Sequence, residues 1–315
     1  MVTRRGGIAF PPPQTSSGLS RRLLWGAVVL GAAMFAVLVG VGLFLTYRIA
    51  TTHDSIENVT PASYLLASYE NLNFADARGG EHAGWLLVGL KGAPVIILCH
   101  GYNSNRSELL SLGTTLQANH FNVYLFNFDG PRSKDGFSNL GIREASILMS
   151  AIARVTKFRG VNPHRVGVYG TTIGAYAGLV AGEENPMVQA LVVDNAYERP
   201  TQMFDSQVDR LLGGAGPIFH LLSRAEFRLL TFRSSYPDVR AGLSKLAGRP
   251  KLFLASENAP ALRKIAEGLY KDAPQPKRLL VLPRTQDTLV SGPERKEYEN
   301  QVLSFFLQNL PLRAD

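Results

Sequence analysis

The feature that most constrains this chain is an uninterrupted apolar run near its start. From Leu23 to Tyr47 it reads "LLWGAVVLGAAMFAVLVGVGLFLTY" and contains no charged residue. A helix needs about 20 apolar residues to cross the hydrocarbon core of a bilayer, whereas the apolar region of a cleavable signal has only about 7–15. The run therefore predicts an uncleaved transmembrane helix over residues 23–47, rather than a helix buried in a protein core.

The residues around this run predict its orientation. Trp25 and Tyr47 lie near its two ends, where aromatic side chains favour the membrane interface. Arginines are more numerous before the run than just after it, at Arg4, Arg5, Arg21 and Arg22 against Arg48. Since positive charge stays on the cytoplasmic side, we expect residues 1–22 to be a disordered cytoplasmic tail of a single-pass signal-anchor protein. The rest of the chain then lies outside the cytoplasm.

Charge and cysteine content exclude several classes of function. The 33 basic and 25 acidic residues give a net charge of +8, but the excess comes mostly from the arginines around the apolar run. No basic cluster remains that would predict a nucleic-acid partner. The single Cys99 excludes an intramolecular disulfide framework and is interpreted as a core residue. Histidines and carboxylates do not converge at metal-ligand spacing, so we expect no metal and no cofactor.

From about residue 66 the pattern of the chain alternates between strand and helix. Predicted strands are 70–75, 83–90, 94–101, 121–128, 164–170, 188–196, 250–256 and 277–283, with a turn at Gly79-Gly80 between the first two. Predicted helices are 107–120, 141–158, 173–182, 261–270 and 294–310. Strands that alternate with helices predict a mostly parallel central sheet with helices on both faces.

Two segments depart from this alternation. Residues 48–65 are interpreted as a linker between the apolar run and the folded domain, which we place at residues 66–315. The stretch 199–246 is mostly helical and interrupts the rhythm late in the domain. We interpret it as a small helical cap over the functional site.

The chain resembles the α/β-hydrolase superfamily over roughly residues 66–312, and looks closest to its serine aminopeptidase-like and lysophospholipase-like branch. The resemblance rests on "ILCHGYNSNRSEL" (97–109), "FNVYLFNFDG" (121–130), "RVGVYGTTIGAYAGL" (165–179) and "ALVVDNAY" (190–197). It implies the α/β-hydrolase fold and a hydrolytic ancestry. It does not by itself imply activity, because function depends on the residues of the site.

The nucleophile elbow G-x-S-x-G is preserved in outline but has lost its serine. Gly170 and Gly174 occupy the flanking positions, and Thr172 stands at the position of the nucleophile. A threonine is strained in the backbone conformation of this turn, so either the turn relaxes or Thr172 stores strain. By resemblance, the backbone amides of Tyr102 and Ile173 would form an oxyanion hole or a ligand site; the alternative is that they hold water or cap the helix.

The other two catalytic positions of the family are also altered. In "ASENA" the acid position falls on Ala259, or on Asn258 if the loop shifts by one residue, while Glu257 is expected to face solvent. In "LPRTQDTLV" the base position falls on Asp287. An aspartate with an ordinary pKa near 4 is a poor general base for a hydroxyl at neutral pH. The triad is therefore interpreted as degenerate.

No other histidine is well placed to replace the missing base. None of the six histidines follows His220, which lies in the expected cap. His100, in the motif "HG", is usually structural in the family. Asp194 is likewise interpreted as structural. His53, His82, His120 and His164 are expected far from the carboxyl ends of the strands, where sites in such sheets lie.

Two functions follow from these observations. The first is a non-catalytic hydrolase relative, held on the outer face of a membrane by residues 23–47, whose pocket binds a small lipid or an ester-like ligand. The second is an active hydrolase of ester, thioester or peptide bonds that uses Thr172 and an unrecognised base. A scaffold without a ligand is a third alternative.

Overall fold

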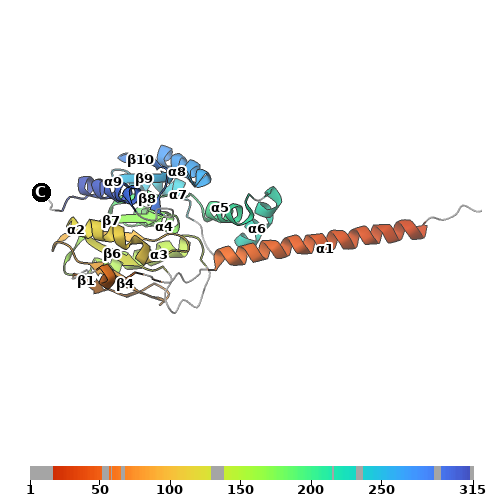
Figure 1. Cartoon of the computed structure of the whole chain (residues 1–315), viewed down its shortest axis with the longest axis horizontal. Coiled ribbons are helices and arrows are strands. Elements are labelled where there is room, and N and C mark those ends of the chain that lie inside the picture. Colours follow the sequence, from red (N-terminus) through yellow and green to blue (C-terminus); the bar gives the residue numbers. More distant parts are fainter. Residues whose placement is uncertain are drawn as a thin grey trace, which may run out of the picture.

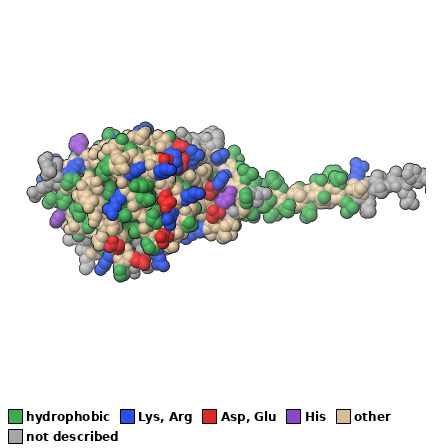
Figure 2. Space-filling view, turned by 90° about the horizontal axis from the view of Figure 1, so that it is seen from above, with side chains coloured by type: hydrophobic (Ala, Val, Ile, Leu, Met, Phe, Trp, Pro, Cys, Tyr) green, Lys and Arg blue, Asp and Glu red, His purple; other side chains and the backbone are tan. Residues whose placement is uncertain are grey.

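A long helix, α1 (Ser17–Ala50), projects from an α/β body in the computed structural model of this chain (Figure 1). The structure describes residues 17–51, 57, 59–64, 68–128, 138–214, 216–231, 237–286 and 292–312. Hydrophobic side chains cover most of the projecting arm, with basic side chains near its far end (Figure 2). Within the described ranges, α1 is the one helix long and apolar enough to cross a membrane. It continues past the predicted span and ends against the body at Ala50.

An eight-stranded sheet forms the centre of the body, in the order β1-β4-β6-β5-β7-β8-β9-β10. Its strands are β1 (Tyr69–Asn71), β4 (Gly84–Leu87), β5 (Ala93–Cys99), β6 (Asn122–Phe126), β7 (Val161–Thr171), β8 (Val188–Asp194), β9 (Lys251–Ser256) and β10 (Lys277–Leu282). The pairs β1–β4 and β4–β6 are antiparallel, and every pair from β6–β5 to β9–β10 is parallel. The predicted mostly parallel sheet is confirmed.

Helices cover both faces of this sheet, as predicted. The helices α3 (Ile142–Val155), α4 (Ile173–Glu184) and α8 (Pro260–Asp272) share one buried cluster, and α2 (Leu110–Ala118) and α9 (Pro293–Asn309) share the other. Alternate side chains of β5 point to opposite faces, as the period of a strand requires. Ile97 and Cys99 join the first cluster, while Ile96 and Leu98 join the second.

The first predicted strand is divided in two. Residues 69–71 form β1 beside β4, whereas β2 (Phe74–Ala75) pairs with β3 (Glu81–His82) in a separate two-stranded sheet across the Gly79-Gly80 turn. The Asp76 carboxylate fixes this turn by accepting hydrogen bonds from the amides of Arg78 (2.9 Å) and Gly80 (2.7 Å). Burial raises the pKa of Asp76, but these bonds and the one to His82 outweigh it and lower that pKa below its ordinary value.

The stretch expected as a cap has two parts. The helices α5 (Pro200–Leu212) and α6 (Pro217–Leu230) project from the body beside the base of α1 (Figure 1). Phe204 of α5 and Phe227 of α6 stack at 4.7 Å between ring centroids and hold the pair together. The short helices α7 (Val239–Gly242) and η3 (Leu243–Leu246) instead lie against α4, so the projecting part is α5 and α6.

Candidate functional site

The sharp turn between β7 and α4 positions Thr172. Its φ is 44° and its ψ is −104°, so the turn has not relaxed and a β-branched residue adopts a left-handed backbone. Such a conformation costs roughly 1–3 kcal/mol. Both flanking glycines are required, because a Cβ at Gly170 would lie 2.2 Å from the Gly174 carbonyl oxygen, and one at Gly174 would lie 2.4 Å from that of Cys99. The backbone of the elbow is therefore intact.

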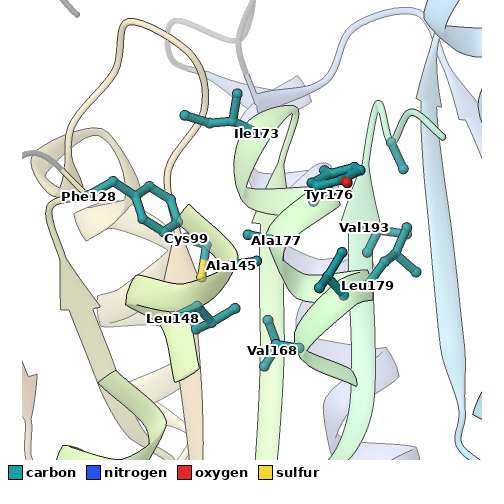
Figure 3. Close-up of a cluster of buried hydrophobic side chains, with 14 of the residues drawn as sticks. Cys99, Phe128, Ala145, Leu148, Val168, Ile173, Tyr176, Ala177, Leu179 and Val193 are labelled. Atoms are coloured by element: carbon teal, nitrogen blue, oxygen red, sulfur yellow. The ribbon is translucent and has the colours of Figure 1, made fainter. Parts of the chain in front are cut away.

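The hydroxyl of Thr172 is bound to the loop after β5. The Tyr102 amide donates a hydrogen bond of 3.0 Å to Thr172 Oγ1, and the Thr172 amide donates one of 2.9 Å to the Asp194 carbonyl. Thr172 is 4% exposed and Ile173 is 5% exposed. Figure 3 shows Ile173 at the start of α4, near the buried cluster that includes Phe128 and Cys99. The structure thus places Tyr102 beside Thr172.

His100 is held by backbone groups on both sides of its ring. Nδ1 lies 2.9 Å from the Gly101 carbonyl oxygen, and Nε2 accepts a hydrogen bond of 3.1 Å from the Phe128 amide. These partners require a proton on Nδ1 and none on Nε2. Burial lowers the pKa of His100 to about 4. The ring is thus neutral and fully bonded, which suits a structural role and not that of a base.

His220 binds carboxylates of the neighbouring helix α5. Its Nε2 lies 2.9 Å from Asp209 Oδ1, and its Nδ1 lies 3.4 Å from Asp205 Oδ1. The ring therefore joins α6 to α5. His82 is also engaged, between Asp76 and the Asn127 carbonyl, at 3.2 and 3.0 Å. Within the ranges that the structure covers, no imidazole nitrogen is bonded to Thr172.

Of the two remaining positions that the resemblance implied, position 259 follows β9 and precedes α8. Ala259 precedes α8, and its amide donates a hydrogen bond of 3.2 Å to the Ser256 carbonyl. Glu257 and Asn258 are exposed. Asp287 lies outside the described residues, just after Gln286. A carboxylate is therefore missing from position 259, and the base position stays a prediction.

Solved structures resemble this chain along most of its length. An esterase from Pyrococcus furiosus superposes with a TM-score of 0.67, covering 83% of this chain and 98% of that one at 15% identity. A dienelactone hydrolase from Anabaena variabilis gives a TM-score of 0.57, covering 77% and 98% at 17% identity. The chain has the α/β-hydrolase fold. No family model matches it.

One sequence relative extends over most of this α/β-hydrolase-fold protein. The chain is 24% identical over 253 residues to the Escherichia coli K12 protein named "Uncharacterized protein YfhR", across 77% of this chain and 82% of that protein. The solved α/β hydrolase GrgF from Penicillium has a TM-score of 0.57, covering 77% of this chain and 99% of that one at 17% identity. These likenesses establish the fold and leave the activity to be argued from the site.

Asp194 anchors a buried hydrogen-bond network behind the elbow. Tyr298 of α9 donates a hydrogen bond of 2.7 Å to Asp194 Oδ2, and the Gln286 amide donates one of 3.2 Å to the same oxygen. The hydroxyls of Tyr298 and Tyr169 lie 2.7 Å apart. Burial, and then the charge of Asp194, raise the pKa of Tyr298 well above its ordinary value. Asp194 thus fastens α9 and the loop after β10 to the elbow.

A second network near the site was missed by the sequence analysis. Glu57 binds Arg106 through both carboxylate oxygens, at 2.8 and 3.0 Å, and accepts a hydrogen bond of 2.6 Å from Asn127. The guanidinium of Arg106 lies 3.6 Å from the centroid of the Trp85 ring. These residues come from distant parts of the chain, so no local pattern could have indicated the network. It ties the segment after α1 to the loop that carries Tyr102.

The end of α1 is bonded directly to the site loop. The Tyr102 hydroxyl donates a hydrogen bond of 2.8 Å to the Ile49 carbonyl, and the Ser138 amide donates one of 2.7 Å to the Ala50 carbonyl. These donors satisfy carbonyl groups that a helix end leaves without an internal partner. Among the described residues, no group of three or more His, Cys, Asp or Glu side chains could hold a metal ion.

Proposed function

We propose that this protein is a non-catalytic relative of the hydrolases, anchored in a membrane, whose site binds a ligand without hydrolysing it. One observation carries the proposal: in the described part of the chain, Thr172 Oγ1 is bonded to the Tyr102 amide and to no imidazole. A hydroxyl nucleophile needs an adjacent general base. Position 259 adds to the argument, because an alanine cannot orient an imidazole.

The proposed anchor is α1, with residues 1–22 in the cytoplasm and the α/β body on the other side. Its length, exposure and apolar sequence support a span. The arginines before the span support the orientation. The described residues give no support for a metal or a cofactor, and none enters the proposal.

The proposed ligand is a small lipid or an ester-like molecule taken from the bilayer. Tyr102 supports this class, because its amide faces Thr172 while its hydroxyl contacts Ile49, two residues after the apolar run ends. A ligand at the elbow would therefore lie close to the membrane interface. The Ile173 amide would serve as a donor to a carbonyl or carboxylate oxygen of the ligand, and the Tyr102 amide would do so by exchanging its bond to Thr172 Oγ1 for one to the ligand.

The alternative is an active hydrolase that uses Thr172 with a base outside the described residues. The preserved elbow favours it, because Thr172 keeps the strained φ of 44° that the turn imposes on a nucleophile. Strain of this kind is found at functional sites and costs stability.

A fluorophosphonate probe that reacts with activated hydroxyl groups separates these two functions. We expect the full-length protein in detergent to remain unlabelled, like its Thr172→Ala variant. Strong labelling of the natural protein that Thr172→Ala abolishes would establish the active hydrolase instead. Native mass spectrometry of the full chain, released from detergent, tests the ligand: a bound lipid mass that survives in Thr172→Ala supports binding without catalysis. If the protein extracted from a native membrane carries no bound lipid mass, the proposed ligand binding is contradicted.

A further inference from the structure

The cap helix α6 contacts α1 inside the apolar run. Thr46 Oγ1 donates a hydrogen bond of 3.3 Å to Glu226 Oε2, and a Cβ added at Gly42 would lie 2.7 Å from the same oxygen. Gly42 and Thr46 are one helical turn apart and both precede the end of the run at Tyr47. The side of α6 that carries Glu226 therefore lies beside the last two turns of the predicted span. Burial raises the pKa of Glu226, and the hydrogen bond from Thr46 partly offsets that effect.

The side of α6 that points away from its buried residues is apolar and exposed. Ser223 and Phe227 are fully buried and mark the inward side of the helix. Residues four apart on a helix lie one above the other, so Leu221, Ala225 and Leu229 form a single row. Leu221 is 69% exposed and Leu229 is 73% exposed, and Ala225 is exposed between them. We call this row the outer face of α6.

Two leucines this exposed in one row form an apolar strip on the surface of the helix, and such a strip is a candidate interaction site. We propose that the outer face of α6 lies in the interfacial layer of the bilayer that α1 crosses. The inference rests on the proposed membrane span of α1, and it makes the cap a second, shallow contact with the lipid.

Continuity with α1 identifies lipid as the partner. At the same level of the molecule, Leu43 and Phe44 of α1 are 52% and 62% exposed. If those side chains meet lipid, a helix packed against Gly42 and Thr46 cannot stand clear of the headgroup layer. A polar flank suits this position, because Arg224 and Arg228 lie beside the outer face and are exposed. Arginine side chains at an interface extend toward water while their aliphatic parts remain on the apolar side.

Spin-label depth measurements on the full chain test the proposal. A nitroxide is attached at Leu221→Cys, Ala225→Cys or Leu229→Cys, and the protein is reconstituted in phosphatidylcholine vesicles. Cys99 is fully buried, so the natural protein gives the labelling background. Phe35→Cys, near the middle of the apolar run, reports on the span itself, and Glu294→Cys, exposed on the body, reports on water. Relaxation by oxygen and by a water-soluble nickel complex gives the depth of each label.

We expect the three labels on α6 to lie about 5–10 Å below the headgroups, shallower than Phe35→Cys and clearly deeper than Glu294→Cys. Labels on α6 that are as accessible to nickel as Glu294→Cys, with Phe35→Cys buried in lipid, would overturn the proposal and leave the span intact. Nickel access at Phe35→Cys would overturn the span and the interfacial cap together.

Discussion

The hydroxyl of Tyr102 donates a hydrogen bond of 2.8 Å to the carbonyl oxygen of Ile49. Through its amide, the same residue binds Thr172 Oγ1 at 3.0 Å. One residue thus joins the end of the apolar helix to the sharpest turn of the α/β body. The site and the proposed anchor form one continuous structure, which supports a ligand that comes from the membrane.

Removing the Tyr102 hydroxyl tests this connection. Tyr102→Phe keeps the ring and the backbone amide but leaves the Ile49 carbonyl without its donor. We expect the free energy of unfolding in detergent to fall by about 0.5–1.5 kcal/mol. Tyr64→Phe, at a tyrosine that is 44% exposed, is the matched control and should change little. Equal stabilities for the two variants would show that the bond contributes nothing.

Restoring a serine at the elbow should not restore hydrolysis. If the protein is non-catalytic as proposed, Thr172→Ser still lacks a general base and an orienting acid, and a general base alone contributes about 10²–10⁴-fold to a rate. We expect the hydrolysis of a p-nitrophenyl ester by this variant to equal that of Thr172→Ala. A rate 10³-fold or more above buffer would mean that an unrecognised base is present.

The strain at Thr172 should be visible in stability. Thr172→Ala and Thr172→Gly both remove the hydroxyl, but only glycine adopts a φ of 44° without steric cost. We expect Thr172→Gly to be more stable than Thr172→Ala by about 1 kcal/mol in urea unfolding. Ala225→Gly in α6 is the control and should have the opposite sign, since glycine destabilises a helix by roughly 0.5–1 kcal/mol. A glycine variant less stable than the alanine variant at position 172 would disprove stored strain.

His100 should make the fold sensitive to mild acid. Burial lowers its pKa in the folded protein to about 4, from the ordinary value of 6.5. The unfolded chain therefore takes up a proton first as the pH falls. The contribution of His100 to the free energy of unfolding is fully present above pH 6.5 and is lost progressively between pH 6.5 and about 4. The full loss is about 3 kcal/mol.

The measurement compares the pH dependence of unfolding in the natural protein and in His100→Gln, whose side chain does not titrate. We expect the variant to have the flatter profile between pH 6.5 and about 4. The difference between the two profiles isolates His100 from the carboxyl groups that titrate in the same range. Parallel profiles would mean that the pKa of His100 in the folded protein is close to its ordinary value.

Strong periodic patterns made the central sheet and its helices predictable from the sequence. The fully apolar run of β5 predicted a strand buried on both faces, and every residue of β5 is buried. The early strands were less predictable, because the division of residues 70–75 depends on Asp76 and on the two different strands with which its halves pair. Short segments whose structure is decided by tertiary contacts carry little local signal.

The site could be predicted as far as its motifs extend. The elbow glycines follow from the local motif, and the place of the Tyr102 amide was implied by the resemblance to the family. The Glu57–Arg106 pair does not, because its partners are 49 residues apart and an ion pair has no sequence pattern. The orientation of His220 toward Asp205 and Asp209 depends on how α5 and α6 pack, which periodicity alone does not specify.

The end of α1 at Ala50 fixes how this helix is joined to the α/β body. Because the carbonyls of Ile49 and Ala50 are bonded to Tyr102 and Ser138, the end of α1 is fixed directly to the α/β body by hydrogen bonds. Each residue of an α-helix adds about 100° of rotation and 1.5 Å of height. A single residue inserted into α1 would therefore turn the preceding part of the helix by about 100° relative to the body and lengthen it by about 1.5 Å. The length of α1 therefore sets how far the body stands from the cytoplasmic end of the proposed span.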